Sequence, residues 1–243
     1  MDMNDRRSIR RYKKEEISQE LLDELFTKAF RASNTGNMQA YSVIVTRDME
    51  MKKKLAPLHF NQRMITEAPV VLTFCADFHR FSKWCEASDA EPCYDNFLSF
   101  FAGATDALLA AQTFAVAAEQ AGLGLCYLGT TNYNAAEIAE VLQLPELVLP
   151  ITTITVGYPD EMPAQSDRLP LNAIVHHEVY DDKQDIKALY AAKEALPENH
   201  AFVHENNKQT LAQVFTDIRY NRATNETCSE KLLAAIKAAK FFK

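Results

Sequence analysis

The segment from residue 94 to residue 121 constrains the fold of this chain more than any other part. It is the longest stretch with helical periodicity in the 243 residues, and alanines occupy most of its faces. A helix that is apolar nearly all round must be covered nearly all round, so the pattern predicts a long, buried central helix. Gly103, Asp106 and Gln112 interrupt its apolar run, which makes the segment too polar for a membrane span.

The remaining periodicities predict short strands and helices around this central helix. Apolar and β-branched runs predict strands at 41–45, 70–76, 125–128 and 149–156. Helical spacing predicts helices at 18–31, 48–55, 134–142, 186–195, 210–219 and 229–242. Residues 158–170 contain three prolines and no periodicity, so they form an extended loop. Because strands are few and one helix is very long, we expect an α+β sandwich in a single domain over 1–243, and not a doubly wound parallel sheet.

The composition limits the function classes. The chain is 47% hydrophobic and 24% charged, which is typical of a soluble globular protein, and its formal net charge is -7. An acidic balance argues against a protein built to bind nucleic acid, although it permits a local phosphate site. Residues 1–14 are strongly polar and do not resemble a signal peptide, so we expect a cytoplasmic location.

An arginine run stands out against that negative charge. Residues 6–11 carry four guanidinium groups, which repel one another unless an anion lies among them. In an extended chain Arg6, Ser8 and Arg10 face the same side, where they could clamp a phosphate. The run alone fits a solvated basic arm equally well. Arg168, a lone arginine between prolines far down the chain, favours the clamp.

Other catalytic and metal-binding motifs are excluded or weak. Gly122 and Gly124 end a helix, and a dinucleotide fingerprint would require glycine at the position of Tyr127. The five cysteines lack zinc spacing and are interpreted as structural, so no metal site is predicted. The six histidines are interpreted as surface or loop residues.

Several polar loops surround the apolar core. They are the arginine run, the loop 33–39, the neighbourhood of Gln62, the turn 127–130 and the segment 166–168. Together they suit a cofactor that needs a phosphate clamp at one end and hydrogen bonds to a flat ring at the other.

These loops occur in the order found in a known family. The chain resembles the nitroreductase family of FMN-dependent NAD(P)H oxidoreductases, in particular the subgroup of the major oxygen-insensitive nitroreductase and the NADPH–flavin oxidoreductase of luminous bacteria. The resemblance covers roughly residues 4–180 and is specific only as an ensemble. Its pieces are the segments 7–12, 37–41, 73–78, 122–129, 157–159, 168–171 and 175–176.

The resemblance implies a fold and an assembly. We expect an α+β three-layer sandwich with a mainly antiparallel central sheet, flanked by helices. The family forms homodimers with FMN at the subunit interface, and residues 185–243 are expected to be a helical extension that wraps the partner.

The resemblance also implies cofactor-binding residues. FMN would be bound by Arg6, Arg7, Ser8, Arg10, Asn34, Thr35, Asn37, Gln39, Gln62, Tyr127, Leu128, Gly129, Thr130, Ser166 and Arg168. In this set the arginines and Ser8 would hold the phosphate, the loop at 34–39 would reach an FMN held mainly by the other subunit, and Tyr127–Thr130 would lie beside the ring. Lys208 would contact NADPH or NADH, and Ser166 and Thr130 depart from the residues usual in the subgroup.

The expected activity is a ping-pong transfer of hydride from NAD(P)H through FMN to nitroaromatics, quinones or flavins, with no catalytic side chain required. One alternative is an FMN carrier or redox sensor with little turnover. Another is a helical interaction protein with a basic arm. The sequence leaves the physiological acceptor open.

Overall fold

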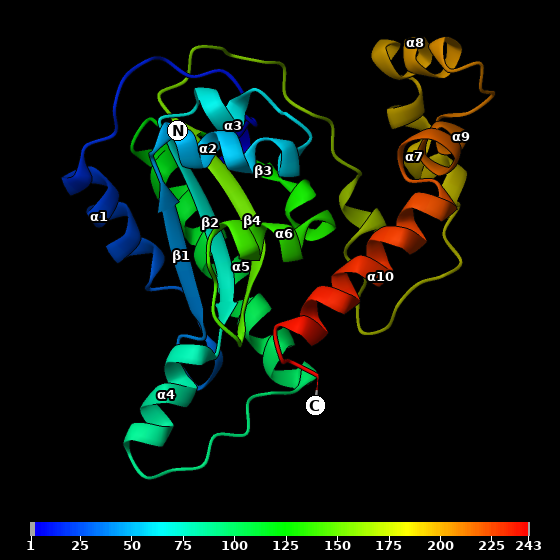
Figure 1. Ribbon diagram of the computed structural model, residues 1–243. Coiled ribbons are helices and arrows are strands. Elements are labelled where there is room, and N and C mark those ends of the chain that lie inside the picture. Colours follow the sequence, from blue (N-terminus) through cyan, green and yellow to red (C-terminus); the bar gives the residue numbers. More distant parts are fainter. Residues whose placement is uncertain (1–2, 243) are drawn as a thin grey trace. The chain divides into compact units, whose positions relative to one another are not determined.

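The computed structural model describes residues 3–242, and a four-stranded sheet forms its centre. The strands are β1 (Tyr41–Thr46), β2 (Val70–Asp77), β3 (Gly124–Leu128) and β4 (Val148–Gly157), in the order β1-β2-β4-β3. All three pairings are antiparallel (Figure 1). The two middle strands, β2 and β4, are buried along their whole length, which accounts for their nearly unbroken apolar and threonine-rich sequences. The four predicted strands are confirmed to within one residue at each end.

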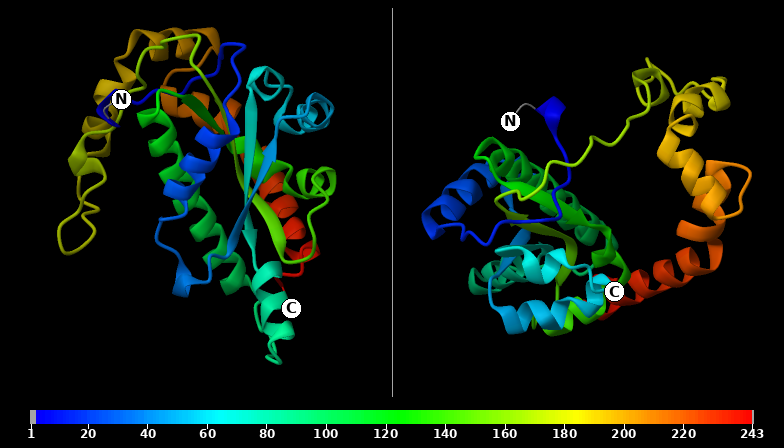
Figure 2. Two further views of the ribbon diagram at one scale, coloured as in Figure 1. Left: turned by 90° about the vertical axis from the view of Figure 1, so that its left-hand side faces the viewer. Right: turned by 90° about the horizontal axis from the view of Figure 1, so that it is seen from above.

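Helices cover both faces of the sheet (Figure 2). One layer contains α5 (Phe97–Gln120), which packs on all four strands, and α1 (Gln19–Ala29), which packs on α5. The other layer contains α2 (Met49–Leu55), α3 (Met64–Glu67) and α6 (Ala135–Val141). Alternate residues of β2 point into the two layers. Leu72 and Phe74 belong to the core beneath α5, and Val71 belongs to the core beneath α2, α3 and α6. The predicted three-layer α+β sandwich is confirmed.

The central helix α5 begins three residues later than predicted. Asn96 caps it, because its side chain accepts a hydrogen bond from the amide of Ser99. Gly122 ends it in the left-handed conformation, with φ of 83°. By length and composition α5 could cross a membrane, but half of its apolar window is buried within the protein. Its contacts with the whole sheet identify it as the core helix of the sandwich.

The chain divides into two compact units, which are described separately. Unit 1 comprises residues 1–164 and 228–243, and unit 2 comprises residues 165–227. Unit 2 is helical, with α7 (Ile186–Glu194), α8 (Pro197–Glu205), α9 (Leu211–Val214) and a π-helix at Phe215–Arg219. The helix α10 (Arg222–Ala238) begins in unit 2 and ends in unit 1. A single domain over 1–243 remains a prediction, as does the role of 185–243 as an extension.

Three helical predictions need correction. The helix α4 (His79–Ala87) was not predicted; Phe78 precedes it without a side-chain cap, so no capping residue marked its start. The helix α8 at 197–205 was not predicted either; Pro197 lies in its first turn, where the missing amide costs nothing. The last helix was expected at 229–242 and spans 222–238, because its polar first two turns carry no apolar stripe. Short 3-10 helices lie at Met3–Asp5 (η1), Thr35–Asn37 (η2), Pro57–His59 (η3), Gly129–Tyr133 (η4) and Leu171–Ala173 (η5).

Candidate functional site

The arginine run lies along the edge of the sheet beside β3. The amide of Ile9 donates to the carbonyl of Leu125 at 2.9 Å, and Tyr12 forms an isolated bridge with Pro159. A Cβ atom on Gly124 would lie 2.6 Å from the side chain of Ile9, so glycine is needed for this close approach. Ile9 and Tyr12 are buried on either side of the exposed Arg10. Burial of the two apolar residues therefore fixes the backbone from which the arginines project.

Two carboxylates accompany the run. The Nε of Arg6 lies 3.3 Å from Oε1 of Glu119, a buried residue of α5, which is a charge contact without hydrogen-bond geometry. Burial raises the pKa of Glu119, and the neighbouring Arg6 opposes the rise. Glu161 accepts hydrogen bonds from the backbone amides of Arg10 at 2.7 Å and Arg11 at 3.1 Å.

One polar atom of the run is left without a partner. The Nε of Arg7 is buried and finds no hydrogen-bond acceptor among residues 3–242. The other end of its guanidinium lies 2.8 Å from the sulfur of Met162, which is a weak acceptor. A buried, unpaired donor on a charged group is costly, and an anion beside it would supply the missing acceptor.

The loop at 34–39 is anchored on α5. Oδ1 of Asp106, which is 1% exposed, accepts from the amide of Thr35 at 2.9 Å and from its hydroxyl at 3.0 Å. Asn37 and Gln39 have φ of 56° and 52°, a left-handed backbone conformation that residues other than glycine seldom adopt. Thr35, Asn37 and Gln39 are exposed, and Asn34 uses its side-chain oxygen to accept from the amide of Gln39. The loop is thus held in one strained conformation that presents polar side chains.

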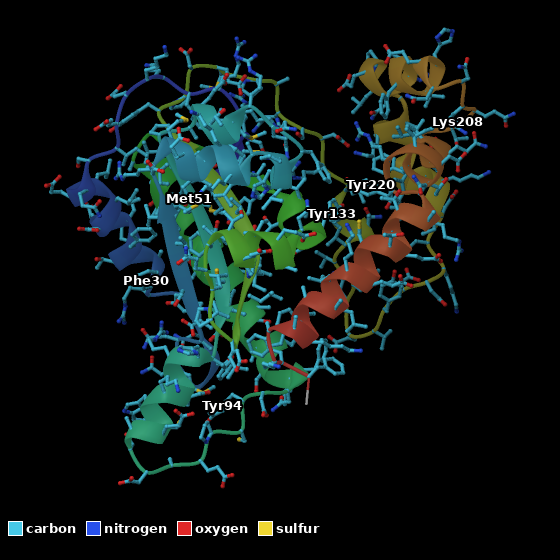
Figure 3. All side chains as sticks on the ribbon, in the orientation of Figure 1. Phe30, Met51, Tyr94, Tyr133, Lys208 and Tyr220 are labelled. Carbon is cyan, nitrogen blue, oxygen red and sulfur yellow. The ribbon has the colours of Figure 1, made fainter. Side chains whose placement is uncertain are left out.

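The turn after β3 packs against the segment that precedes Gln62. Nδ1 of His59 lies 2.8 Å from Oγ1 of Thr130, and both side chains are buried. Close by, the ring of Phe60 stacks on that of Tyr133, which Figure 3 labels, with centroids 6.1 Å apart. The turn itself is accessible at Gly129, where an added Cβ would meet nothing within 4 Å.

Tyr127 begins this turn and belongs to a polar cluster. Its hydroxyl donates to Gln112 of α5 at 3.3 Å. Burial raises the pKa of Tyr127, with Arg6 opposing the rise and Glu119 adding to it. Leu128 is buried. Unit 1 thus brings the arginine run and the turn 127–130 to the same strand, β3.

The predicted residues of unit 2 form a separate group. Arg168 is exposed and donates to the carbonyls of Ser166 at 3.2 Å and Asp167 at 2.8 Å. Lys208, labelled in Figure 3, forms an ion pair with Asp217 at 2.8 Å. That ion pair and the hydroxyl of Thr216 lower the pKa of the exposed Asp217. The participation of Ser166, Arg168 and Lys208 in one site with unit 1 stays a prediction.

Three of these polar side chains were not predicted as site residues. Glu161 follows the extended proline-rich segment and carried no signal. Asp106 did carry one, since it is a carboxylate within an alanine-rich helix, but it served only as evidence against a membrane span. His59 was interpreted as a surface or loop residue; it does lie in the short turn η3, but it is not at the surface, because it is 0% exposed.

Comparison with known proteins places this geometry in a family. The nitroreductase family model matches residues 3–158. This chain belongs to the nitroreductase family. It is 35% identical over 210 residues to the FMN reductase [NAD(P)H] of Bacillus subtilis. The aligned region covers 86% of this chain and 84% of the relative.

Solved structures agree with this assignment over nearly the whole chain. A Bacteroides fragilis protein described as a candidate oxidoreductase is 56% identical, with a TM-score of 0.97 and coverage of 99% of this chain and 98% of that one. The NfrA2 protein of Bacillus megaterium is 34% identical, with a TM-score of 0.85 and coverage of 99% and 97%.

Proposed function

We propose that this protein is an FMN-dependent NAD(P)H oxidoreductase of the nitroreductase and flavin reductase type. Membership of the nitroreductase family supports this, as does the similarity to a relative named FMN reductase [NAD(P)H]. The observation that carries the proposal is that the arginine run pairs with β3 through Ile9, and that the same strand leads into the accessible backbone turn at Gly129.

The residues of unit 1 fit FMN at its phosphate end. Arg7 has a buried Nε without an acceptor, and a phosphate oxygen would supply one. Arg6 and Ser8 are half-buried and Arg10 is exposed, so their side chains remain open to a ligand. Arg168 of unit 2 is expected to join this clamp.

The residues also fit the ring end. The exposed Gly129 leaves room for a flat group beside the backbone of Tyr127–Thr130, where N–H groups would stabilise negative charge on a ring. Gln62 would meet the edge of the ring. Asn34, Thr35, Asn37 and Gln39 would reach FMN from the preorganised loop on α5.

FMN, when bound, would supply the redox chemistry, taking hydride from NAD(P)H and passing electrons in a ping-pong cycle to nitroaromatics, quinones or flavins. The chain's own residues bind the phosphate, orient the ring and shape the surface on which the nicotinamide and the acceptor alternate. No acid or base side chain is assigned to the cycle.

Lys208 is proposed to contact the NAD(P)H co-substrate. Its ammonium pairs with Asp217 at 2.8 Å. NADPH and NADH are both proposed as co-substrates.

We also propose a cytoplasmic homodimer with FMN at its interface, in which 185–243 wraps the partner. An apolar stripe along α5 supports a dimer: Leu98 is 76% exposed and Phe101 is 60% exposed. The net charge of -7 argues against a nucleic-acid partner, and it is consistent with electron acceptors that are small molecules.

Flavin content tests the proposal. The purified protein should be yellow, and replacing both Arg10→Ala and Arg168→Ala should release FMN. Arg11→Ala is the matched control, because this arginine lies in the same run but outside the assigned clamp. A double variant that keeps full flavin occupancy would show that the clamp is wrong, and bound FMN without NADPH-dependent quinone reduction would favour a carrier.

A further inference from the structure

A buried histidine joins two loops of the candidate ring pocket. His59 is 0% exposed and lies at the end of η3, three residues before Gln62. Its Nδ1 is 2.8 Å from Oγ1 of Thr130 in η4, the turn that follows β3. These two loops are separated by almost seventy residues of sequence, and this side-chain contact joins them.

Two further contacts bring the same loops together. The side-chain amide of Asn134 donates to the carbonyl of Leu58 at 2.6 Å. The rings of Phe60 and Tyr133 stack at 6.1 Å with an interplanar angle of 22°. Asn134 and the stacked rings flank the His59–Thr130 contact, so the imidazole lies at the centre of a small interface between η3 and η4.

The backbone between His59 and Gln62 is strained. Phe60 and Asn61 have φ of 56° and 53°, and neither is glycine. Two consecutive residues in this region are strained, and the conformation persists only when the surroundings fix it. The amide of Gln62 donates to the carbonyl of His59 at 3.2 Å, so the direction in which Gln62 leaves this turn depends on where His59 is held.

The second ring nitrogen of His59 has no partner. Nε2 is buried and forms no hydrogen bond with any of residues 3–242. An unpaired acceptor is tolerated better than an unpaired donor, so the network assigns the proton to Nδ1 and makes Nδ1–H the donor to Thr130. Burial alone lowers the pKa of His59 to about 4, and the ring is therefore neutral at physiological pH. Among the described residues, the contact of Nδ1 with Thr130 is the one hydrogen bond that the ring makes.

We propose that His59 is a positioning residue. Through its hydrogen bond to Thr130 it holds the turn 127–130 and the Gln62 segment in a fixed position relative to each other. The assignment of these loops to the ring pocket rests on the proposed function. The coupling between the loops does not, because it follows from contacts within unit 1. His59 thereby fixes the spacing between the two sides from which the chain would hold a flat ring.

Amide hydrogen exchange of the flavin-free protein tests the coupling directly. The variants are His59→Leu, which removes the hydrogen bond at similar volume, Thr130→Val, which removes the hydroxyl, and the double variant. We expect exchange at residues 59–63 and 128–131 to accelerate about tenfold in each single variant. The double variant should be no faster than the singles, because all three lack the same contact. His59→Asn carries an amide near the position of Nδ1 and should restore protection.

FMN titration and the flavin midpoint potential of the same variants then test the consequence. We expect His59→Leu and Thr130→Val to weaken FMN binding about tenfold and to shift the potential equally, with His59→Asn near wild type. If His59→Leu does not fold, Thr130→Val and His59→Asn still decide the question. Exchange at 59–63 that is unchanged in Thr130→Val, or additive effects in the double variant, would overturn the coupling. A wild-type protein that binds no FMN would overturn the proposed function, while the exchange data would still decide the coupling.

Discussion

At the scale of single residues, His59 gives the protein a defined response to acid. The folded protein keeps this imidazole neutral down to about pH 4, whereas an unfolded chain takes up the proton near pH 6.5. Between these values the unfolded state binds more protons, so the free energy of unfolding falls as pH falls and is fully restored above pH 6.5. The difference corresponds to about 3 kcal/mol. Urea denaturation at pH 7.5 and pH 4.5 measures it.

His59→Asn is the control for this prediction, because an amide does not titrate. The part of the acid destabilisation that belongs to His59 should vanish in the variant, while the part due to carboxylates elsewhere remains. Equal pH dependence of the wild type and His59→Asn between pH 4.5 and pH 7.5 contradicts the assignment.

The burial of His59 could not have been predicted from sequence. The flanking Pro57, Leu58 and Phe60 have no periodicity that marks a buried face, and the residue that covers the imidazole, Thr130, is seventy-one positions away. Cys75 and Cys126, in contrast, lie within strand-like apolar runs, which indicate burial, and both are buried. Local pattern thus predicts burial within regular elements and does not predict it for irregular turns.

At the scale of elements, the loop 34–39 depends on its anchor on α5. Asp106→Ala removes the carboxylate that accepts from the amide and hydroxyl of Thr35 and, at 3.4 Å, from the amide of Ala40. We expect a loss of about 2 kcal/mol of stability, because the buried amide of Ala40 loses its acceptor, and weaker FMN binding because the loop relaxes. Chemical denaturation and FMN titration measure the two effects.

Thr27→Ala on α1, which packs on α5, is the matched control, because it lies outside the exposed stripe of α5. Its exposed hydroxyl donates back to the carbonyl of Asp23 at 2.8 Å, so stability should change by less than about 0.5 kcal/mol. Should Asp106→Ala bind FMN as tightly as Thr27→Ala, the anchored loop does not contribute to the cofactor site.

Element prediction succeeded where one physical signal was dominant. The strands β2 and β4 are buried on both faces, so their β-branched runs identified them. The helix α8 and the start of α10 lack an apolar stripe over several turns, and α4, in which Phe81, Trp84 and Cys85 recur at helical spacing, begins without a capping side chain. The candidate loops were found by composition, but the contacts that hold them, such as Asp106 on α5, arise only in the fold.

At the scale of the whole molecule, the candidate FMN residues are divided between unit 1 and unit 2. The arginine run and the turn 127–130 share β3, while Ser166 and Arg168 belong to unit 2. The family order of motifs relates these segments in the sequence, and their participation in one site stays a prediction. Composition and spacing alone could not relate them, because no local pattern relates Arg168 to a strand some forty residues earlier.

The exposed stripe of α5 leads to the prediction for the assembly. Leu98, Phe101, Leu108 and Leu109 are 76%, 60%, 48% and 43% exposed, and their spacing places them along one side of the helix. A stripe of this kind on a core helix is expected to be covered by a second copy of the chain. The double variant Phe101→Glu with Leu108→Glu should therefore be monomeric in light scattering after gel filtration. It should also lose FMN, because the proposed site is completed at the interface.

Met49→Glu is the control for this prediction. Met49 is 45% exposed on α2 in the opposite layer, so this variant should stay dimeric and yellow. A wild-type protein that is monomeric at micromolar concentration, or a double variant that remains dimeric, excludes this stripe as the interface.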